Sequence, residues 1–132
     1  MTKQNTSNIS QIPKSLKVWF VIHFIVDILF AIPLIFFPIW LLGLFGLSAN
    51  EAVMARLVGA ALVGIGGVSV LAKNMSIDSF NTMLTLKLLW SSSAVLGFLI
   101  SLFAGAPKSV WLFVFIFAVF FFIWMYYKNR IK

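Results

Sequence analysis

The chain has 132 residues, of which 62% are hydrophobic and only 10% are charged, and its formal net charge is +7. Soluble domains carry roughly 25% charged residues, so this composition excludes an ordinary soluble domain. The apolar residues gather in four runs, each long enough to cross about 30 Å of hydrocarbon. Since the sequence has no cysteine, disulfides, thiol redox chemistry and thiolate metal ligands are also excluded. We therefore predict an all-α polytopic membrane protein, with a single four-helix transmembrane bundle over residues 15–128.

The basic residues stand mainly at the ends of the apolar runs, which favours a role in topology over nucleic-acid binding. One predicted side of the membrane holds Lys3, Lys14, Lys17, Lys73, Lys128, Arg130 and Lys132. The other side holds only Lys108. Because cytoplasmic segments are enriched in lysine and arginine, both termini are predicted to be cytoplasmic, in a protein of the cell membrane.

The first predicted span has proline residues in its second half. Residues 1–14 are predicted to be a disordered polar tail, and the span itself covers about residues 15–42. Pro33 and Pro38 have no N–H to donate to the helix, so they should kink or break it. An alternative for residues 37–46 is therefore that they lie along the membrane interface instead of spanning.

Three further spans are predicted, at about residues 51–72, 80–104 and 108–127. A serine and a glutamate, Ser48 and Glu51, have the spacing of a capping box at the start of the second span. Gly105 and Pro107 are typical of a helix end followed by a helix start. Residues 129–132 form a basic tail.

Small residues recur in the second and third predicted spans, where they would let neighbouring helices approach closely in lipid. The predicted packing positions are Gly59, Ala60, Gly64, Gly67, Ser93, Gly97 and Ser101. The fourth span is instead bulky on all sides, with phenylalanine and tryptophan throughout. We therefore expect the first three helices to pack tightly. The fourth should lie at the lipid-facing periphery or at an oligomer seam.

Four ionisable residues lie well inside the predicted spans: His23, Asp27, Arg56 and Lys87. A charge is costly in the bilayer interior, so each should face protein and find a partner. Their estimated depths predict an ion pair between Asp27 and Arg56. One positive charge is then unbalanced and must reach water, a lipid headgroup or an anionic ligand. Ser91 is expected to form an interhelical hydrogen bond, with cavity lining as the alternative.

Each of these residues also has a purely structural interpretation. The Asp27–Arg56 pair could only lock two helices together, Lys87 could extend its ammonium group to the interface, and His23 could be a hydrogen-bonded core histidine. The sequence has no metal-ligand spacing, no catalytic constellation and no phosphate-binding glycine loop. These features favour a protein without metal or cofactor and disfavour an enzyme, with proton chemistry through His23 and Asp27 left open.

A family resemblance is carried by three motifs in the first two spans: Pro38-x-Trp40, Phe45-Gly46 and Ala55-Arg56-Leu57-x-Gly59-Ala60-Ala61-Leu62-x-Gly64-x-Gly66. With them, the chain resembles small four-helix prokaryotic membrane proteins, and it is similar in size and layout to the DoxX-like group. This resemblance implies a compact four-helix bundle in a group whose functions are mostly unassigned. Small multidrug transporters are similar in having one membrane carboxylate on the first helix, here Asp27, but their other motifs are missing.

Three functions stay open at this point. The first is a binding or accessory protein whose Asp27, Arg56 and Lys87 hold a lipid or a small amphiphilic or anionic ligand, or which serves as a subunit of a larger assembly. The second is a small proton-coupled transporter that uses Asp27. The third is a holin-like pore former, although the polar groups are too few to line a wide lumen. The expected partners are membrane lipids and either a second copy of the chain or another membrane protein.

Overall fold

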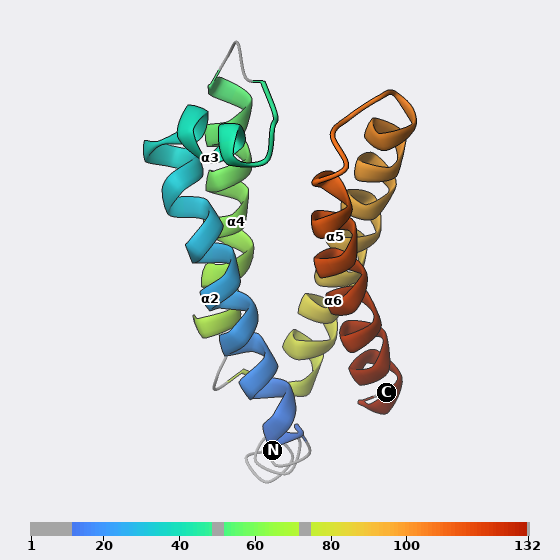
Figure 1. Cartoon of the computed structure of the whole chain (residues 1–132). Helices are drawn as coiled ribbons and strands as arrows, with labels where there is room; N and C mark the ends of the chain where they lie inside the picture. The colour runs from blue at the N-terminus through green and yellow to red at the C-terminus, as the bar shows by residue number, and fades with distance from the viewer. Residues whose placement is uncertain (1–11, 49–51, 72–74, 132) are drawn as a thin grey trace, which may run out of the picture.

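The computed structural model describes residues 12–48, 52–71 and 75–131. These residues form five helices and no strand: α2 (Lys14–Phe36), α3 (Pro38–Leu44), α4 (Val53–Leu71), α5 (Ile77–Phe103) and α6 (Val110–Arg130) (Figure 1). All except α3 are long and apolar enough to cross a membrane. For the described part of the chain, the predicted all-α fold with four such helices is confirmed.

The first predicted span is two helices, because the chain breaks between Phe36 and Pro38. Pro33 stays inside α2, whereas Pro38 takes the first position of α3, where a missing N–H does no harm. Phe37 between them has φ −133° and ψ 53°, which is not helical. A residue that precedes proline is disfavoured in the helical region, so Pro38 accounts for the break.

Two glycines with positive φ end helices, Gly46 at 70° and Gly105 at 98°. After α5, the N–H of Ala106 donates to the carbonyl oxygen of Ser101 at 3.0 Å, which is the bond of a Schellman motif. The helix end expected at Gly105 is therefore present, with the last helical residue at Phe103.

Some predicted features fall outside the described residues. Most of the N-terminal tail, the capping box that ends at Glu51 and the loop residue Lys73 are among them.

The helices associate as two pairs. In the first pair α2 packs against α4, with α3 against α2, and in the second pair α5 packs against α6. Figure 1 shows the two pairs close together where α2 begins and α6 ends, and apart toward α3 and the connection after α5. The expected tight group of the first three long helices is therefore wrong, because α5 packs mainly on α6.

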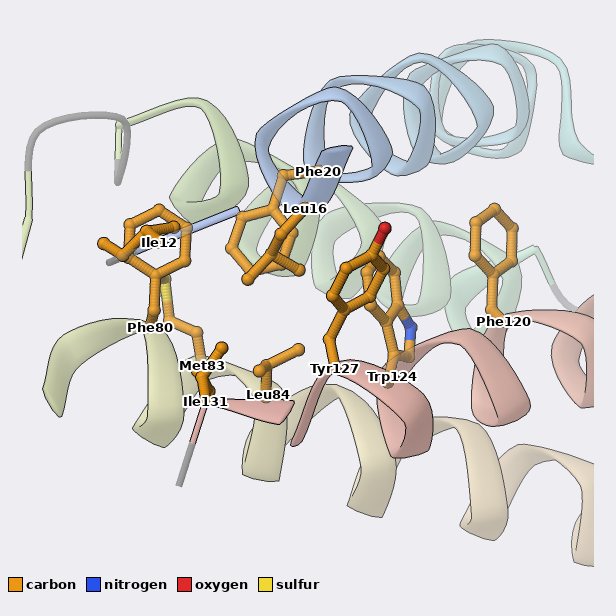
Figure 2. Packing of buried hydrophobic residues seen from close by; sticks show 10 residues of the cluster. All are labelled: Ile12, Leu16, Phe20, Phe80, Met83, Leu84, Phe120, Trp124, Tyr127 and Ile131. Atoms are coloured by element: carbon orange, nitrogen blue, oxygen red, sulfur yellow. The ribbon is translucent and has the colours of Figure 1, made fainter. Parts of the chain in front are cut away.

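A group of buried apolar side chains joins the two pairs where they meet, and we call it the basal cluster (Figure 2). Its buried members are Ile12, Leu16, Phe20, Phe80, Met83, Leu84, Phe120, Trp124, Tyr127 and Ile131. The rings of Phe20 and Phe80 stack at 5.1 Å between centroids, and Trp124 meets Phe20 edge to face at 5.6 Å. Because Trp124 is 0% exposed, the expectation of a peripheral α6 is also wrong: its aromatic side chains build this core.

Two glycines of α4 allow its close contact with α2. A Cβ atom at Gly59 would lie 2.7 Å from Cγ1 of Ile35 and 3.1 Å from the carbonyl oxygen of Ala31. A Cβ atom at Gly66 would lie 3.0 Å from both Cβ and Oδ2 of Asp27. A real Cβ atom does not fit at the 2.7 Å found for Gly59, and at Gly66 Asp27 would have to move by a few tenths of an ångström. Glycine at these two positions therefore permits the close packing.

The other predicted packing positions differ from expectation. A Cβ atom at Gly64, Gly67 or Gly97 would meet nothing within 4 Å in the described structure. Ala60, Ser93 and Ser101 are exposed. Small residues allow a close helix contact only where another helix packs against them. In the described chain no helix packs closely against these positions.

Gly59→Leu should destabilise the protein by roughly 1–3 kcal/mol, because the new side chain overlaps α2. Gly64→Leu is the matched control, since it makes the same change on the same helix in open space. Reversible unfolding of both variants in mixed micelles measures the difference. Equal losses would contradict the α2–α4 contact described here.

Candidate functional site

A cluster of polar side chains is buried next to the basal cluster, where α2, α4 and α5 meet, and we call it the polar cluster. It consists of His23, Asp27, Ser69, Lys87 and Ser91, each at most 5% exposed. His23 and Asp27 lie one turn apart on α2, and Lys87 and Ser91 one turn apart on α5, while α4 supplies Ser69. Residues four apart lie on the same face of a helix, so the two side chains of each pair point in the same direction.

The ammonium group of Lys87 is enclosed on all sides. Its Nζ lies 2.8 Å from Nδ1 of His23 and donates to Oγ of Ser69 at 2.6 Å. It also lies 4.9 Å from the centroid of the Phe20 ring and 5.1 Å from that of Trp124, within cation–π range. With 1% exposure, Lys87 does not extend to the interface, so that structural interpretation is wrong.

His23 stands between the two charged residues of the polar cluster. The Nδ1 atom that contacts Lys87 also lies 3.3 Å from Oδ2 of Asp27. A ring nitrogen either accepts or donates, so Nδ1 cannot accept from Lys87 and donate to Asp27 at the same time. Oδ2 of Asp27 is buried and has no hydrogen-bond partner within the described residues. The cluster is thus one hydrogen-bond donor short whenever Nδ1 accepts from Lys87.

Arg56 lies elsewhere, and the expected Asp27–Arg56 ion pair is wrong. The Arg56 side chain is exposed, and its Nε donates to the carbonyl oxygen of Ile35 at 3.1 Å. Ile35 is near the end of α2, where the break at Pro38 leaves carbonyl groups without helical partners. A cation at a helix C-terminus is favourable, so Arg56 caps α2.

This position of Arg56 changes the charge count of the site. With His23 uncharged, the polar cluster holds one carboxylate, on Asp27, and one ammonium group, on Lys87. The two charges balance when Asp27 is ionised and Lys87 is protonated. The sequence-based inference of an unbalanced positive charge that awaits an anionic ligand therefore loses its basis.

A cavity of about 840 Å³ lies between the two helix pairs. Its wall is mostly aliphatic and aromatic, with Phe30, Phe117 and Phe120 among its residues. Within the described part of the chain, the ionisable residues that line it are His23 and Asp27. Small-molecule sites typically measure roughly 300–1,000 Å³ and combine apolar walls with a few polar groups, so this cavity has the size and character of one.

The small residues of α5 form part of the cavity wall. Ser93, Gly97 and Ser101, predicted to pack against another helix, all line the cavity. A Cβ atom at Gly97 would meet nothing within 4 Å, and the residue lines this cavity. Their small size therefore leaves room between the helix pairs.

Sequence reasoning missed two members of the site and misjudged another. Ser69 accepts from Lys87 and donates to the carbonyl oxygen of Ile65 at 3.1 Å. Its signal was a lone hydroxyl inside an apolar span. Trp90 lines the cavity, and its buried Nε1 has no partner within the described residues. Ser91 is buried, but its Oγ forms no hydrogen bond with the described residues.

Comparisons with protein-family models, with curated proteins and with solved structures find no match to this chain. The resemblance to DoxX-like proteins therefore stays a prediction, and the function has to be argued from the site.

A double-mutant cycle should couple Asp27 to Lys87 and not to Arg56. Asp27→Asn and Lys87→Met each leave one buried charge uncompensated, so their combined cost should be smaller than the sum by about 1–3 kcal/mol. The matched cycle of Asp27→Asn with Arg56→Met should be additive, because Arg56 contacts Ile35. Unfolding in mixed micelles measures both cycles, and a larger coupling to Arg56 would refute this geometry.

Proposed function

We propose that this chain is an integral protein of the cell membrane that binds an amphiphilic molecule in the cavity between its two helix pairs. The observation that supports this function is a cavity of about 840 Å³ whose apolar wall ends at a buried pair of ionisable residues, His23 and Asp27. An apolar body fits the wall, and a polar end group fits the polar cluster. In a membrane protein, buried ionisable groups are costly and mark functional sites by default.

We also propose that both termini face the cytoplasm. Lys14 and Lys17 at the start of α2, with Lys128 and Arg130 at the end of α6, give that end of the molecule its positive charge. The basal cluster would then close the cavity toward the cytoplasm. The cavity would extend from the polar cluster toward the opposite side of the membrane, where Phe45 and Ala106 line it.

Filling the cavity should remove the bound molecule. In Gly97→Phe the new ring enters the cavity, whereas in Gly64→Phe it enters open space outside it. Native mass spectrometry of protein purified in mild detergent should show a retained amphiphile with wild type and Gly64→Phe. Retention by Gly97→Phe should fall about tenfold or more. Wild-type protein that carries no such molecule, and binds none on addition, would refute the proposal.

A second function, a small proton-coupled transporter, is favoured by one contact. Nδ1 of His23 lies within reach of both Lys87 and Asp27, so a proton can pass between α5 and the cavity-lining residue of α2. Asp27 would then alternate between a protonated form and a form that binds the substrate. The apolar cavity wall gives no comparable support to a holin-like pore, which needs a wide aqueous lumen.

Asp27→Asn should abolish proton-coupled flux if the protein is a transporter, because asparagine cannot take up the proton. Proteoliposomes with a trapped pH-sensitive dye would report proton movement when the retained amphiphile is added. His23→Gln should slow the flux without abolishing it, since the carboxylate stays in place. Unchanged proton movement in Asp27→Asn would remove the transport hypothesis and leave binding.

A further inference from the structure

We infer that the molecule in this cavity is electrically neutral and presents a hydroxyl-type hydrogen-bond donor to Asp27. This inference rests on the proposed amphiphile-binding function and specifies the chemistry of the ligand's polar end. It is carried by the hydrogen-bond geometry of the polar cluster, by its charge balance and by the residues that line the cavity.

From inside the cavity, a ligand meets Asp27 and His23 but not Lys87. Asp27 and His23 line the cavity, whereas Lys87 does not and is 1% exposed. The ammonium group lies behind the histidine, held by Ser69 and His23. Within the described residues, the part of the polar cluster that a ligand can contact is therefore the carboxyl group of Asp27 and the ring of His23, with no free cation. When Nδ1 of the neutral ring accepts from Lys87, its Nε2 is a hydrogen-bond donor.

The carboxyl group of Asp27 needs a donor that the described chain does not supply. Oδ2 is buried without a hydrogen-bond partner in the described chain. The nearest candidate donor is Nδ1 of His23, which cannot donate to Asp27 while it accepts from Lys87. An unsatisfied buried acceptor costs roughly 1–3 kcal/mol. A ligand hydroxyl on the cavity side of Asp27 would give this carboxyl group a donor. A ligand that ends in acceptors alone, such as a carboxylate or a phosphate, would instead place negative charge beside Asp27.

The charge balance of the polar cluster determines which charge the ligand's donor group can carry. An ionised Asp27 and a protonated Lys87 leave the polar cluster without net charge when His23 is neutral. An anionic ligand would leave one net negative charge in the apolar interior, and a cationic ligand one net positive charge. A net charge buried in a medium of low dielectric constant is strongly unfavourable. A hydroxyl group donates its proton to Asp27 and changes no charge.

The other charged residues do not alter this count. Arg56 is exposed and donates to the carbonyl oxygen of Ile35 at the far end of α2. From α6, the residues that pack on His23 are the rings of Phe120 and Trp124, at 4.7 and 5.3 Å between centroids. From α4 it is the hydroxyl of Ser69 that reaches Lys87. The described residues around the polar cluster thus add no further charge to it.

The experiment compares three probes that share a twelve-carbon chain: 1-dodecanol, dodecanoate and dodecylammonium. Each is titrated into the purified protein in nanodiscs, and native mass spectrometry gives the fraction bound. Wild type should bind 1-dodecanol about tenfold more tightly than either charged probe. Gly97→Phe fills the cavity, so any binding that remains in this variant takes place outside it. This substitution should lower the affinity for all three probes.

Charge variants then reverse the order of the probes. In Asp27→Asn the ammonium group of Lys87 is uncompensated, so dodecanoate should become the preferred probe. In Lys87→Met the carboxylate of Asp27 is uncompensated, so dodecylammonium should be preferred. Arg56→Met is the matched control and should keep the wild-type order, because Arg56 lies outside the polar cluster.

The outcomes separate this inference from the function on which it rests. Equal affinity for the three probes, or a wild-type preference for a charged one, would overturn the neutral-ligand inference while cavity binding stands. No cavity-dependent binding of any probe would refute the proposed function itself. If Asp27→Asn does not fold, the wild-type order and Lys87→Met decide the question.

Discussion

The enclosed ammonium group of Lys87 is the constraint on which the arrangement of this molecule depends. It lies on α5, yet its partners are His23 on α2 and Ser69 on α4, so it ties the second helix pair to the first. The rings of Phe20 and Trp124 exclude water from it. Because a buried cation needs a compensating charge, the position of Asp27 one turn from His23 is part of the same constraint.

Around this group the molecule has a closed end and an open one. Aromatic side chains from α2, α5 and α6 fill the closed end as the basal cluster. Beyond the polar cluster the two helix pairs separate, and small residues of α5 such as Gly97 border the cavity between them. Small residues therefore serve two purposes here: Gly59 and Gly66 bring α2 and α4 together, and Gly97 keeps space open.

The polar residues inside the spans could be found from sequence, because an ionisable group in a long apolar run is conspicuous. Which of these residues contact one another could not be found from sequence. Arg56 and Asp27 were predicted to pair because of their opposite charges and their estimated depths. The break at Pro38 instead leaves carbonyl groups at the end of α2 without helical partners, and Arg56 donates to that of Ile35. Lys87 then takes its place near Asp27. Ser69 escaped notice since a single hydroxyl in a helix usually bonds its own backbone, as it also does here.

The sequence by itself determined the four long apolar helices, the break at Pro38 and the helix end at Gly105, because hydrophobic run length, a missing N–H and a positive φ are local properties. Only the tertiary structure decided the pairing of helices, the burial of α6 and the partners of each charge. In lipid, apolar helix faces do not distinguish one neighbour from another, so shape and a few polar contacts choose among arrangements. Those contacts join residues as far apart as His23 and Lys87, and no local pattern encodes them.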